Sequence, residues 1–401
     1  MKEKVVLAFS GGLDTSFCVP YLKNEKNLEV HTVMVNTGGF GKEEEEKIKE
    51  RALKLGAASH TNINAVDTYY NKGIKYLIFG NILKNSTYPL SVSSERIFQA
   101  LAVLEHVKKI GAEYVAHGST GAGNDQVRFD IVFEILAPEV KIIAPIRELA
   151  LSRKEEIDYL AKHGFDYSWE KSKYSINQGI WGTSIGGVET LSSDGYLPEE
   201  AYIHHVAEHL NGKEEKVTVG FEKGEPCSLN GVKMQPVEVI KKLEEIAAPY
   251  GIGRDMHVGD TIIGIKGRVG FEAAAPLIII KSHHLLEKHV LVKNQLYWKE
   301  MISNYYGQLM HEAQYLDPVA RDMEAFLEST QQNVTGEVDV LLRPYSFFVL
   351  GCRSAHDLMS SKFGEYGELN KSYTGRDVVG FTKVMSNPLK IFYAVNEQQQ
   401  Q

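Results

Sequence analysis

The sequence predicts an α/β protein with a parallel-sheet domain at its N-terminus, a second α+β domain and a helical C-terminal tail. Up to about residue 165, short apolar runs alternate with helix-like segments, the pattern of a parallel sheet covered by helices on both faces. Two of those runs end in glycine-rich turns. Beyond about residue 170, short turn-bounded strands mix with long helical patterns, which indicates a separate α+β domain.

Composition limits the partners that the protein can have. Its 401 residues exceed one average domain, and we expect boundaries near 1–168, 169–360 and 361–401. A hydrophobic content of 43% is ordinary for a soluble protein, and a net charge of −8 argues against a nucleic-acid-binding surface. The three cysteines are too scattered for a disulfide framework or a cysteine zinc site, and we find no signal segment or bilayer-length apolar run. We therefore expect a cytoplasmic protein without nucleic-acid or membrane partners.

The N-terminal elements follow in order. Residues 5–7 and 30–35 predict the first two strands, and Pro20 is expected to kink the helix between them. Residues 42–55 predict a helix that stops at Gly56, and its run of glutamates is better explained as a solvated face than as a metal or partner site. The i,i+4 pairs expected on that helix are Glu43 with Lys47 and Glu45 with Lys49.

Further along, apolar residues recur at helical spacing from Ile97 to Val107, up to a stop at Gly111, and residues 114–116 predict a strand. Ser152-Arg-Lys-Glu155 has the form of a capping box and predicts a helix that ends near Gly164. In the second half we expect strands at 217–221, 262–265 and 346–350, one extended helical pattern over 282–315, and a new helix at Asp317-Pro318. The last four glutamines, 398–401, are expected to be disordered.

Two groups of histidines have spacing compatible with shared helix faces. Neither group has the glutamate of an H-E-x-x-H motif or a cysteine partner, so we interpret them as surface or core histidines rather than metal ligands. The groups are His204, His205 and His209, and His283, His284 and His289.

The first glycine-rich turn runs from Ala8 through Phe9, Ser10, Gly11, Gly12, Leu13, Asp14 and Thr15 to Ser16. Its glycines allow a tight turn and a close approach to a ligand, and its hydroxyls lie beside backbone N–H groups at a helix N-terminus, which favours phosphate binding. It lacks the Lys-Ser/Thr pair of a Walker P-loop. It is similar instead to the pyrophosphate loop of the N-type ATP pyrophosphatases, which cleave ATP between its α- and β-phosphates.

The second glycine-rich turn, residues 117–129, also follows a strand, where open α/β sheets bind ligands. Directly after its glycines come an amide, a carboxylate and a guanidinium, in Asn124, Asp125 and Arg128. A carboxylate can hold an ammonium and an arginine can hold a carboxylate, so this set suits a zwitterionic amino acid.

Together the two turns resemble the argininosuccinate synthase family, over nearly the whole chain. Residues 88–90, 174–176, 181–185 and 251–254 support the resemblance, although the later blocks are altered. It implies a HUP-type ATP-binding domain, a synthetase and multimerisation domain, and a C-terminal oligomerisation segment. The implied ATP site is Ala8 to Ser16 with Val35 and Gly118; the aspartate site is Thr120, Asn124 and Asp125; the citrulline site is Tyr88, Ser93, Asn124, Arg128, Ser175 and Ser184.

The resemblance implies a ligase that uses ATP with Mg²⁺ and forms a homotetramer. The citrulline oxygen would attack the α-phosphate to give citrullyl-AMP and pyrophosphate, and the amine of aspartate would then displace AMP. Asp14 would orient the first loop or bind the metal-pyrophosphate, and Asp125 would hold the amine of aspartate in line. No protein-held metal site and no covalent enzyme intermediate is expected.

The departures from the family cluster on the acceptor side. Where the family reads Trp-Gly-Arg-Ser-Ile-Glu-Gly, this chain has Thr183 and Gly186, and at a citrulline-binding Glu and Tyr it has Gly259 and Phe271. The lysine usual in the second loop is Ala122, whereas the first loop departs only at Phe9. Two alternatives stay open: an N-acylated acceptor such as acetyl- or succinylcitrulline, or free citrulline with Asp260 supplying the carboxylate.

Other classes fit less well. A tRNA-thiolating enzyme needs a reactive cysteine pair and a basic surface, and a glutamine-dependent synthetase needs a glutaminase cysteine, for which Cys18 inside the first helix cannot serve. A non-catalytic nucleotide-binding homologue is the remaining alternative.

Overall fold

The computed structural model describes all residues except 1, 166–172, 207–211, 365, 368–370 and 398–401. The chain divides into two compact units, residues 1–355 and 356–401, which are described separately below. The expected boundary at 168, the glutamine tail and His209 lie outside the described residues. No described helix is both long and apolar enough to cross a membrane.

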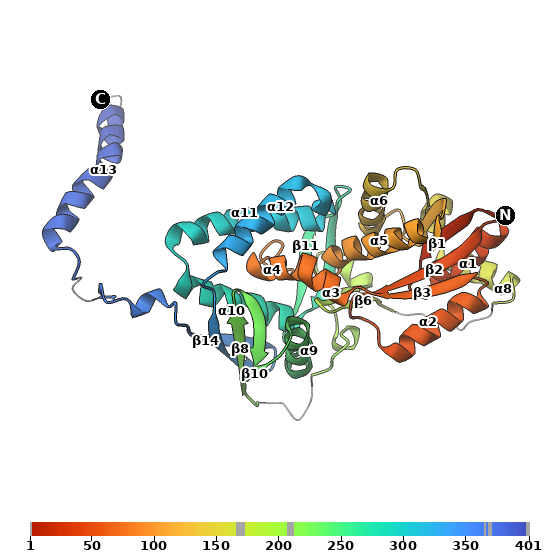
Figure 1. The fold of residues 1–401 in the computed structure, drawn as a ribbon, viewed down its shortest axis with the longest axis horizontal. Coiled ribbons are helices and arrows are strands. Elements are labelled where there is room, and N and C mark those ends of the chain that lie inside the picture. The colour runs from red at the N-terminus through yellow and green to blue at the C-terminus, as the bar shows by residue number, and fades with distance from the viewer. Residues whose placement is uncertain (1, 166–172, 207–211, 365, 368–370, 398–401) are drawn as a thin grey trace. The chain divides into compact units, whose positions relative to one another are not determined.

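A five-stranded parallel sheet forms the N-terminal part, as the sequence predicts (Figure 1). Its spatial order is β3-β2-β1-β4-β5, so the chain leaves β1 on one side toward β2 and later returns on the other side as β4. The carboxyl ends of β1 and β4 therefore flank a topological switch point, where open α/β sheets bind ligands. The strands are β1 (Lys4–Ala8), β2 (Glu29–Asn36), β3 (Ser59–Asn64), β4 (Tyr114–His117) and β5 (Lys141–Ile143).

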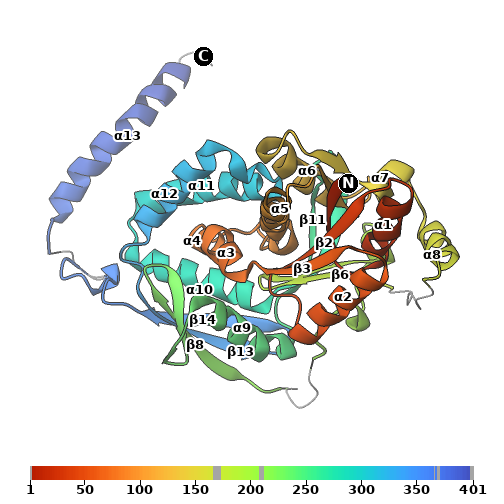
Figure 2. The same ribbon diagram turned by 45° about the vertical axis from the view of Figure 1, so that its right-hand side comes forward.

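Helices cover both faces of this sheet, because successive residues of β1 point to opposite sides (Figure 2). Val5 and Leu7 pack with α1, α2 and α8, whereas Val6 packs with α5 and α6. The expected caps are present at Ser152, which caps α8, and at Gly111, which ends α5 with a φ of +63°. The helices are α1 (Leu13–Asn24), α2 (Lys42–Lys54), α3 (Val66–Tyr69), η1 (Tyr70–Ile74), α4 (Lys75–Phe79), α5 (Ser91–Ile110), α6 (Asp125–Leu136), α7 (Pro145–Leu149) and α8 (Arg153–Lys162).

One expected ion pair on α2 is wrong. Glu43 pairs with Lys47 as predicted, at 2.7 Å, but Lys49 pairs with Glu46. Glu45 instead accepts a hydrogen bond from the side-chain amide of Asn36, because this face of α2 turns toward the end of β2.

Two antiparallel sheets make up the second half of the first unit. A four-stranded sheet has the order β11-β12-β7-β6, and a five-stranded sheet has the order β10-β9-β8-β13-β14. The first consists of β6 (Ser175–Gly179), β7 (Gly182–Gly186), β11 (Arg254–Asp260) and β12 (Lys266–Glu272). The second consists of β8 (Glu215–Glu222), β9 (Glu225–Leu229), β10 (Val232–Lys233), β13 (Gly336–Arg343) and β14 (Ser346–Arg353).

The strand expected at 262–265 is wrong, whereas those at 217–221 and 346–350 are confirmed as parts of β8 and β14. Residues 261–265 form the turn between β11 and β12. Gly264 adopts a φ of +84° in this turn, and the Thr261 N–H donates to the carbonyl of Ile265. The segment therefore turns the chain, although its isoleucines favour a strand.

The single extended helix expected over 282–315 is also wrong, because it breaks into α10 and α11. Leu291 and Val292 are extended, with ψ values of 145° and 158°, and the Gln295 side chain accepts from the Val292 N–H at the start of α11. The restart at Asp317 is confirmed as the cap of α12. These helices are α9 (Pro236–Ala247), α10 (Ala274–Val290), α11 (Lys293–His311) and α12 (Pro318–Thr330), with short 3₁₀ turns at Val188–Thr190, Glu199–Ala201, Ala248–Tyr250 and Gln314–Leu316.

The second unit contains a short 3₁₀ turn, Leu358–Ser360, and the helix α13 (Gly375–Glu397), which confirms the predicted helical tail. Its described side chains are nearly all exposed, including large apolar ones such as Phe381 and Phe392.

Candidate active site

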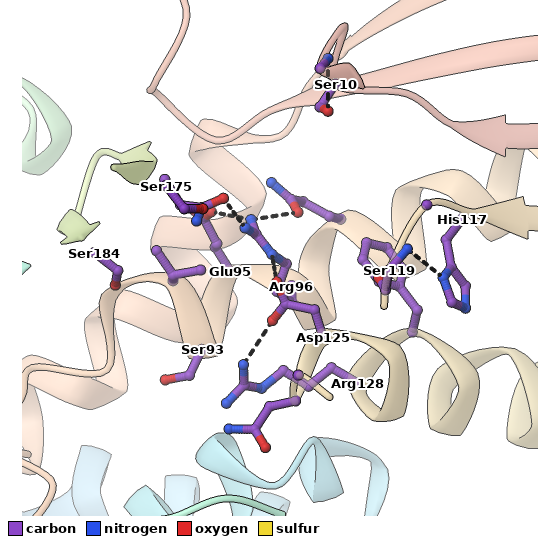
Figure 3. Close-up of a pocket in the computed structure, with 18 of the residues that line it drawn as sticks. Ser10, Ser93, Glu95, Arg96, His117, Ser119, Asp125, Arg128, Ser175 and Ser184 are labelled. Atoms are coloured by element: carbon purple, nitrogen blue, oxygen red, sulfur yellow. Dashed lines mark hydrogen bonds and ion pairs between the residues drawn. The ribbon is translucent and has the colours of Figure 1, made fainter. Parts of the chain in front are cut away.

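A cavity of about 1060 Å³ opens at the carboxyl ends of β1 and β4 and extends toward β7, β11 and β12 (Figure 3). Both glycine-rich turns line it, and so do side chains from α5, α6 and the end of α11. Residues more than 300 positions apart in the sequence therefore face one space, between the parallel sheet and the antiparallel β11-β12-β7-β6 sheet.

The first glycine-rich turn forms one end of the cavity. Gly11 has a φ of +78°, and Gly12 is the extended N-cap of α1, so the turn presents backbone N–H groups at a helix N-terminus. Ser10 accepts a hydrogen bond from the Gly12 N–H at 3.4 Å and lies 3.3 Å from the Thr15 hydroxyl. Of the nine residues predicted here, Gly11 and Ser16 do not line the cavity, and Ser16 is fully buried. Val35 and Gly118 do line it.

Asp14 lies at this end beside Glu156 from α8. The two carboxyl groups share a hydrogen bond, and burial together with the charge of Asp14 raises the pKa of Glu156 to about 8. Burial also raises the pKa of Asp14. Two carboxyl groups this close cannot both ionise easily, so the pair favours a shared proton or a bound cation.

The second glycine-rich turn packs against the first. A Cβ atom on Gly118 would lie 2.9 Å from the Thr15 methyl carbon and 3.2 Å from its backbone nitrogen, so only glycine fits this contact without displacing the first turn. His117 supports the turn: its Nδ1 accepts from the Ser119 N–H at 3.2 Å, and its Nε2 donates to Asp130 at 2.9 Å. Thr120 and Asn124 both line the cavity, and Asn124 accepts a hydrogen bond from the backbone of Ile262 at 2.8 Å.

Asp125 lies between two arginines in the middle of the cavity. It binds Arg96 Nε at 3.0 Å with one oxygen and Arg128 Nη1 at 2.9 Å with the other. Burial opposes ionisation of Asp125, but the two guanidinium groups outweigh it and hold its pKa below the usual range. Arg128 is in turn fixed by the backbone carbonyl of His311, which accepts from its Nε and Nη2 at 3.2 Å each.

Arg96 and Glu95 line the same cavity, and the sequence analysis does not single them out. Arg96 also donates to the side chain of Asn177 at 2.8 Å, and Glu95 pairs with Arg96 at 2.6 Å while accepting from Thr37 at 3.0 Å. Burial raises the pKa of Glu95 to about 7, against the opposing effect of Arg96. One feature of the sequence could have identified them. An acidic and a basic residue stand side by side near the start of a helix whose other buried residues are apolar or small.

The remaining predicted acceptor residues lie on the side of the cavity away from the first turn (Figure 3). The Tyr88 hydroxyl is 3.1 Å from the Ser184 hydroxyl and accepts from Ser91 at 3.0 Å. Ser93 is buried, and its hydroxyl has no partner. Ser175 is exposed at the mouth. All the residues predicted for aspartate and citrulline therefore border one space, together with two histidines the sequence did not single out, His257 and His311.

No group of three or more His, Cys, Asp or Glu side chains in the described part of the chain is arranged to hold a metal ion. His204 lies in a bend and His205 follows it, so neither is on a helix, and His204 pairs with Glu272 at 3.2 Å. His283 is buried and bonds the side chains of Asn81 and Gln331, which is the core role expected from the sequence.

Comparison with known proteins extends over almost the whole chain. A family model described as Arginosuccinate synthase N-terminal HUP domain matches residues 4–166, and one described as Arginosuccinate synthase C-terminal domain matches residues 174–392. Curated relatives named argininosuccinate synthase include one from Methanocaldococcus jannaschii, 39% identical over 96% of both chains. Others come from Dictyoglomus thermophilum, 37% identical over 96% of both chains, and Xanthomonas campestris pv. campestris, 36% identical over 98% of this chain and 99% of the relative.

The first family match ends and the second begins between α8 and β6, where the parallel sheet is complete and the antiparallel sheets begin. Similarity at this level covers both walls of the cavity. The chain therefore belongs to the argininosuccinate synthase family.

Proposed function

We propose that this protein is an argininosuccinate synthase that joins the ureido group of citrulline to the amine of aspartate, converting ATP to AMP and pyrophosphate. The observation that carries the proposal is the contact between the two glycine-rich turns at the switch point, with Asp125 and its two arginines in the same cavity. Phosphate-binding turns and an amino-acid-binding cluster in one space are what a reaction between a nucleotide and two amino acids needs.

The reaction has two displacements. In the first, the ureido oxygen attacks the α-phosphorus and the bond to the β-phosphate oxygen breaks, so that pyrophosphate leaves. In the second, the amine nitrogen of aspartate, having lost a proton, attacks the ureido carbon and AMP leaves with the oxygen. Backbone N–H groups of residues 10–15, with the hydroxyls of Ser10 and Thr15, stabilise the charge that builds on the leaving pyrophosphate.

Asp125 orients the second nucleophile. Its carboxylate stays ionised because of Arg96 and Arg128, so it can hold the ammonium of incoming aspartate, while Thr120 and Asn124 border the same space. Arg128 lies within reach of a substrate carboxylate, and Tyr88, Ser93, Ser175 and Ser184 face the acceptor. Holding both reactants in line is the main contribution expected from such a site.

Mg²⁺ fits the end of the cavity at the first turn. Asp14 presents a carboxylate there next to Glu156, and Mg²⁺ requires only one or two protein carboxylates when substrate phosphates supply other ligands. When bound, the ion would neutralise charge on the departing pyrophosphate. Asp14 is the residue that would hold it.

We further propose that the protein works as a homotetramer in the cytosol. Exposed apolar side chains follow α13, and aromatic side chains are exposed along α11, as expected of helices that pack against other subunits. All three cysteines are free thiols, which suits a reducing compartment.

An omission experiment tests the proposed function. ATP, Mg²⁺, citrulline and aspartate together should yield AMP and pyrophosphate in equal amounts, and leaving out either ATP or aspartate should abolish argininosuccinate formation. A protein that binds ATP but releases no pyrophosphate with the full set would be a non-catalytic homologue, and the proposal would be wrong.

A further inference from the structure

The acceptor end of the cavity holds three polar side chains that are buried and incompletely bonded. Ser93 is 3% exposed, and His257 and His311 are 6% exposed each. The Ser93 hydroxyl and His257 Nδ1 have no hydrogen-bond partner, and the ring nitrogens of His311 have no partner of regular geometry, although the backbone of Asp260 lies close to that ring. Buried polar atoms are costly to leave unpaired, so three of them around one cavity indicate a ligand that pairs with them.

The two histidines lie close to Tyr88: His257 is on β11, and His311 is the last residue of α11. The His257 ring stacks on the Tyr88 ring with 5.1 Å between centroids. The His311 ring contacts the His257 ring edge-on, with 6.4 Å between centroids. Gly259, two residues along the same face of β11, has no side chain, and a Cβ there would lie 2.8 Å from His257 Nε2. The His257 imidazole therefore fills the space that a side chain at residue 259 would otherwise take. We call the surface formed by Ser93, His257, Gly259 and His311 the acceptor wall.

Both imidazoles are uncharged at neutral pH. Burial and the charges of Arg128 and Lys84 lower the pKa of His311 to about 3, although the backbone of Asp260 partly opposes this. Burial and Lys84 also lower the pKa of His257. Arg128 and Lys84 are thus charged groups that disfavour a positive charge on His311.

No carboxylate among the described lining residues is free to balance a positive ligand at this wall. Asp125 is assigned, in the proposed function, to the ammonium of aspartate, and Glu95 is paired with Arg96. Asp14 and Glu44 lie beside the first turn or on α2. Asp260 borders the cavity next to Gly259, but its side chain alternates to the exposed face of β11, where its carboxylate pairs with Lys266 at 2.5 Å. Asp260 therefore does not supply the carboxylate that a free α-ammonium would need.

We propose that this wall accepts an acceptor ureide whose α-nitrogen is acylated and uncharged at least as well as it accepts citrulline. This inference rests on the proposed function and uses the same bonds and leaving groups. An amide can donate to an imidazole nitrogen and accept from an imidazole N–H or from Ser93, whereas an ammonium meets neutral rings and nearby cations. Burying an ammonium without a counter-charge is strongly unfavourable.

Steady-state kinetics with three acceptors tests it: citrulline, Nα-acetylcitrulline and Nα-methylcitrulline, each with ATP, Mg²⁺ and aspartate and with pyrophosphate release as the readout. Acetylation removes the charge, whereas methylation adds bulk and keeps the charge. We expect kcat/KM for the acetyl compound to equal or exceed that for citrulline, and the methyl compound to fall below the acetyl compound. A lower kcat/KM for the acetyl compound than for citrulline would overturn the inference while leaving the proposed function intact, and no turnover of any acceptor would overturn both.

Gly259→Glu gives a second readout. Its Cβ meets only the ends of the His257 and Asn85 side chains, which can move, and its carboxylate would face the acceptor. The matched control is Val258→Glu, which adds the same charge on the exposed face of β11, outside the cavity lining. We expect Gly259→Glu to shift the preference toward citrulline by at least about tenfold and Val258→Glu to leave it unchanged. Equal shifts in both variants would contradict the assigned wall.

Discussion

The carboxylate of Asp125 stays ionised although it is buried. Burial alone would favour its protonated form, and two arginines at about 3 Å reverse that preference. The same arginines are held by partners on three other elements, β6, α5 and the end of α11, so the carboxylate has a fixed position. The proposed role of Asp125, to orient the amine of aspartate, leads to a specific kinetic prediction.

Replacing Asp125 by Asn should lower kcat/KM for aspartate by about 100-fold or more, because an ammonium loses its charged partner. The first displacement should suffer far less, since it needs no aspartate. Citrulline-dependent exchange of labelled pyrophosphate into ATP measures that step separately.

The matched control is Glu134→Gln on the same helix, because Glu134 is exposed and lies outside the cavity lining. This control should leave the ratio of the pyrophosphate-exchange rate to the overall turnover rate unchanged. Equal losses in exchange and in overall turnover for Asp125→Asn would mean that this carboxylate only maintains the fold.

Glu95 predicts a pH dependence of stability. Its pKa in the folded protein, about 7, lies above its ordinary value of 4.5, so the folded state binds a proton more tightly than the unfolded state between those values. Stability from this group is therefore fully present below pH 4.5 and is lost as the pH rises toward 7. Glu95→Gln should flatten the fall in melting temperature over that window, by a few degrees in all.

Glu105→Gln is the control, because Glu105 is exposed on the same helix. Its melting temperatures should follow those of the unmodified protein across the pH range. The explanation would be wrong if both variants gave the same pH profile.

Among the structural elements, the two glycine-rich turns are in direct contact, so the position of one fixes the position of the other. Each follows a strand of the parallel sheet, β1 or β4, and those strands are neighbours on either side of the switch point. The tight fit of Gly118 against Thr15 fixes the relative position of the turns without any side chain between them.

Gly118→Ala should therefore raise KM for ATP by about tenfold or more, because the added methyl group displaces the backbone of the first turn. Gly121→Ala is a matched control in the same turn: its Cβ would make only an ordinary contact, 3.7 Å from Arg147, and it lies outside the cavity lining. Initial-rate measurements at varied ATP decide between them. Equal KM values for the two variants would exclude the contact as a determinant of ATP binding.

Local patterns in the sequence were sufficient for those elements whose residues interact with near neighbours. The strand-glycine-helix runs, the capping box at Ser152 and the cap at Asp317 depend on contacts within a few residues. The segment 262–265 misled because isoleucines favour strands while Gly264 turns the chain. The sequence gives no sign that His257 and His311 face the site, because His257 packs on Tyr88, more than 160 residues away, and His311 in turn packs on His257.

For the whole molecule, the proposed tetramer would give the unit formed by residues 356–401 a role in contacts with other subunits. Large apolar side chains on α13 are more than half exposed in the single chain, among them Phe381, Leu389 and Phe392. An isolated helix of this kind gains little stability in water without a partner surface.

Phe392→Asp should weaken the tetramer and give smaller species in analytical ultracentrifugation, because a charge would be placed in an apolar interface. Asn387→Asp adds the same charge on α13 without removing an apolar side chain and should leave the tetramer intact. A tetramer unaffected by Phe392→Asp would place the subunit contact elsewhere, and a monomeric unmodified protein would contradict the proposed assembly.

In the proposed reaction, the first glycine-rich turn holds the outer phosphates of ATP while the α-phosphorus is attacked by the ureido oxygen. Transfer of an isotope label tests this most directly. With citrulline labelled with ¹⁸O in its ureido group, plus ATP, Mg²⁺ and aspartate, the label should appear in the phosphate of AMP, and pyrophosphate should stay unlabelled. Formation of ADP and orthophosphate, or unlabelled AMP accompanying argininosuccinate, would contradict the account.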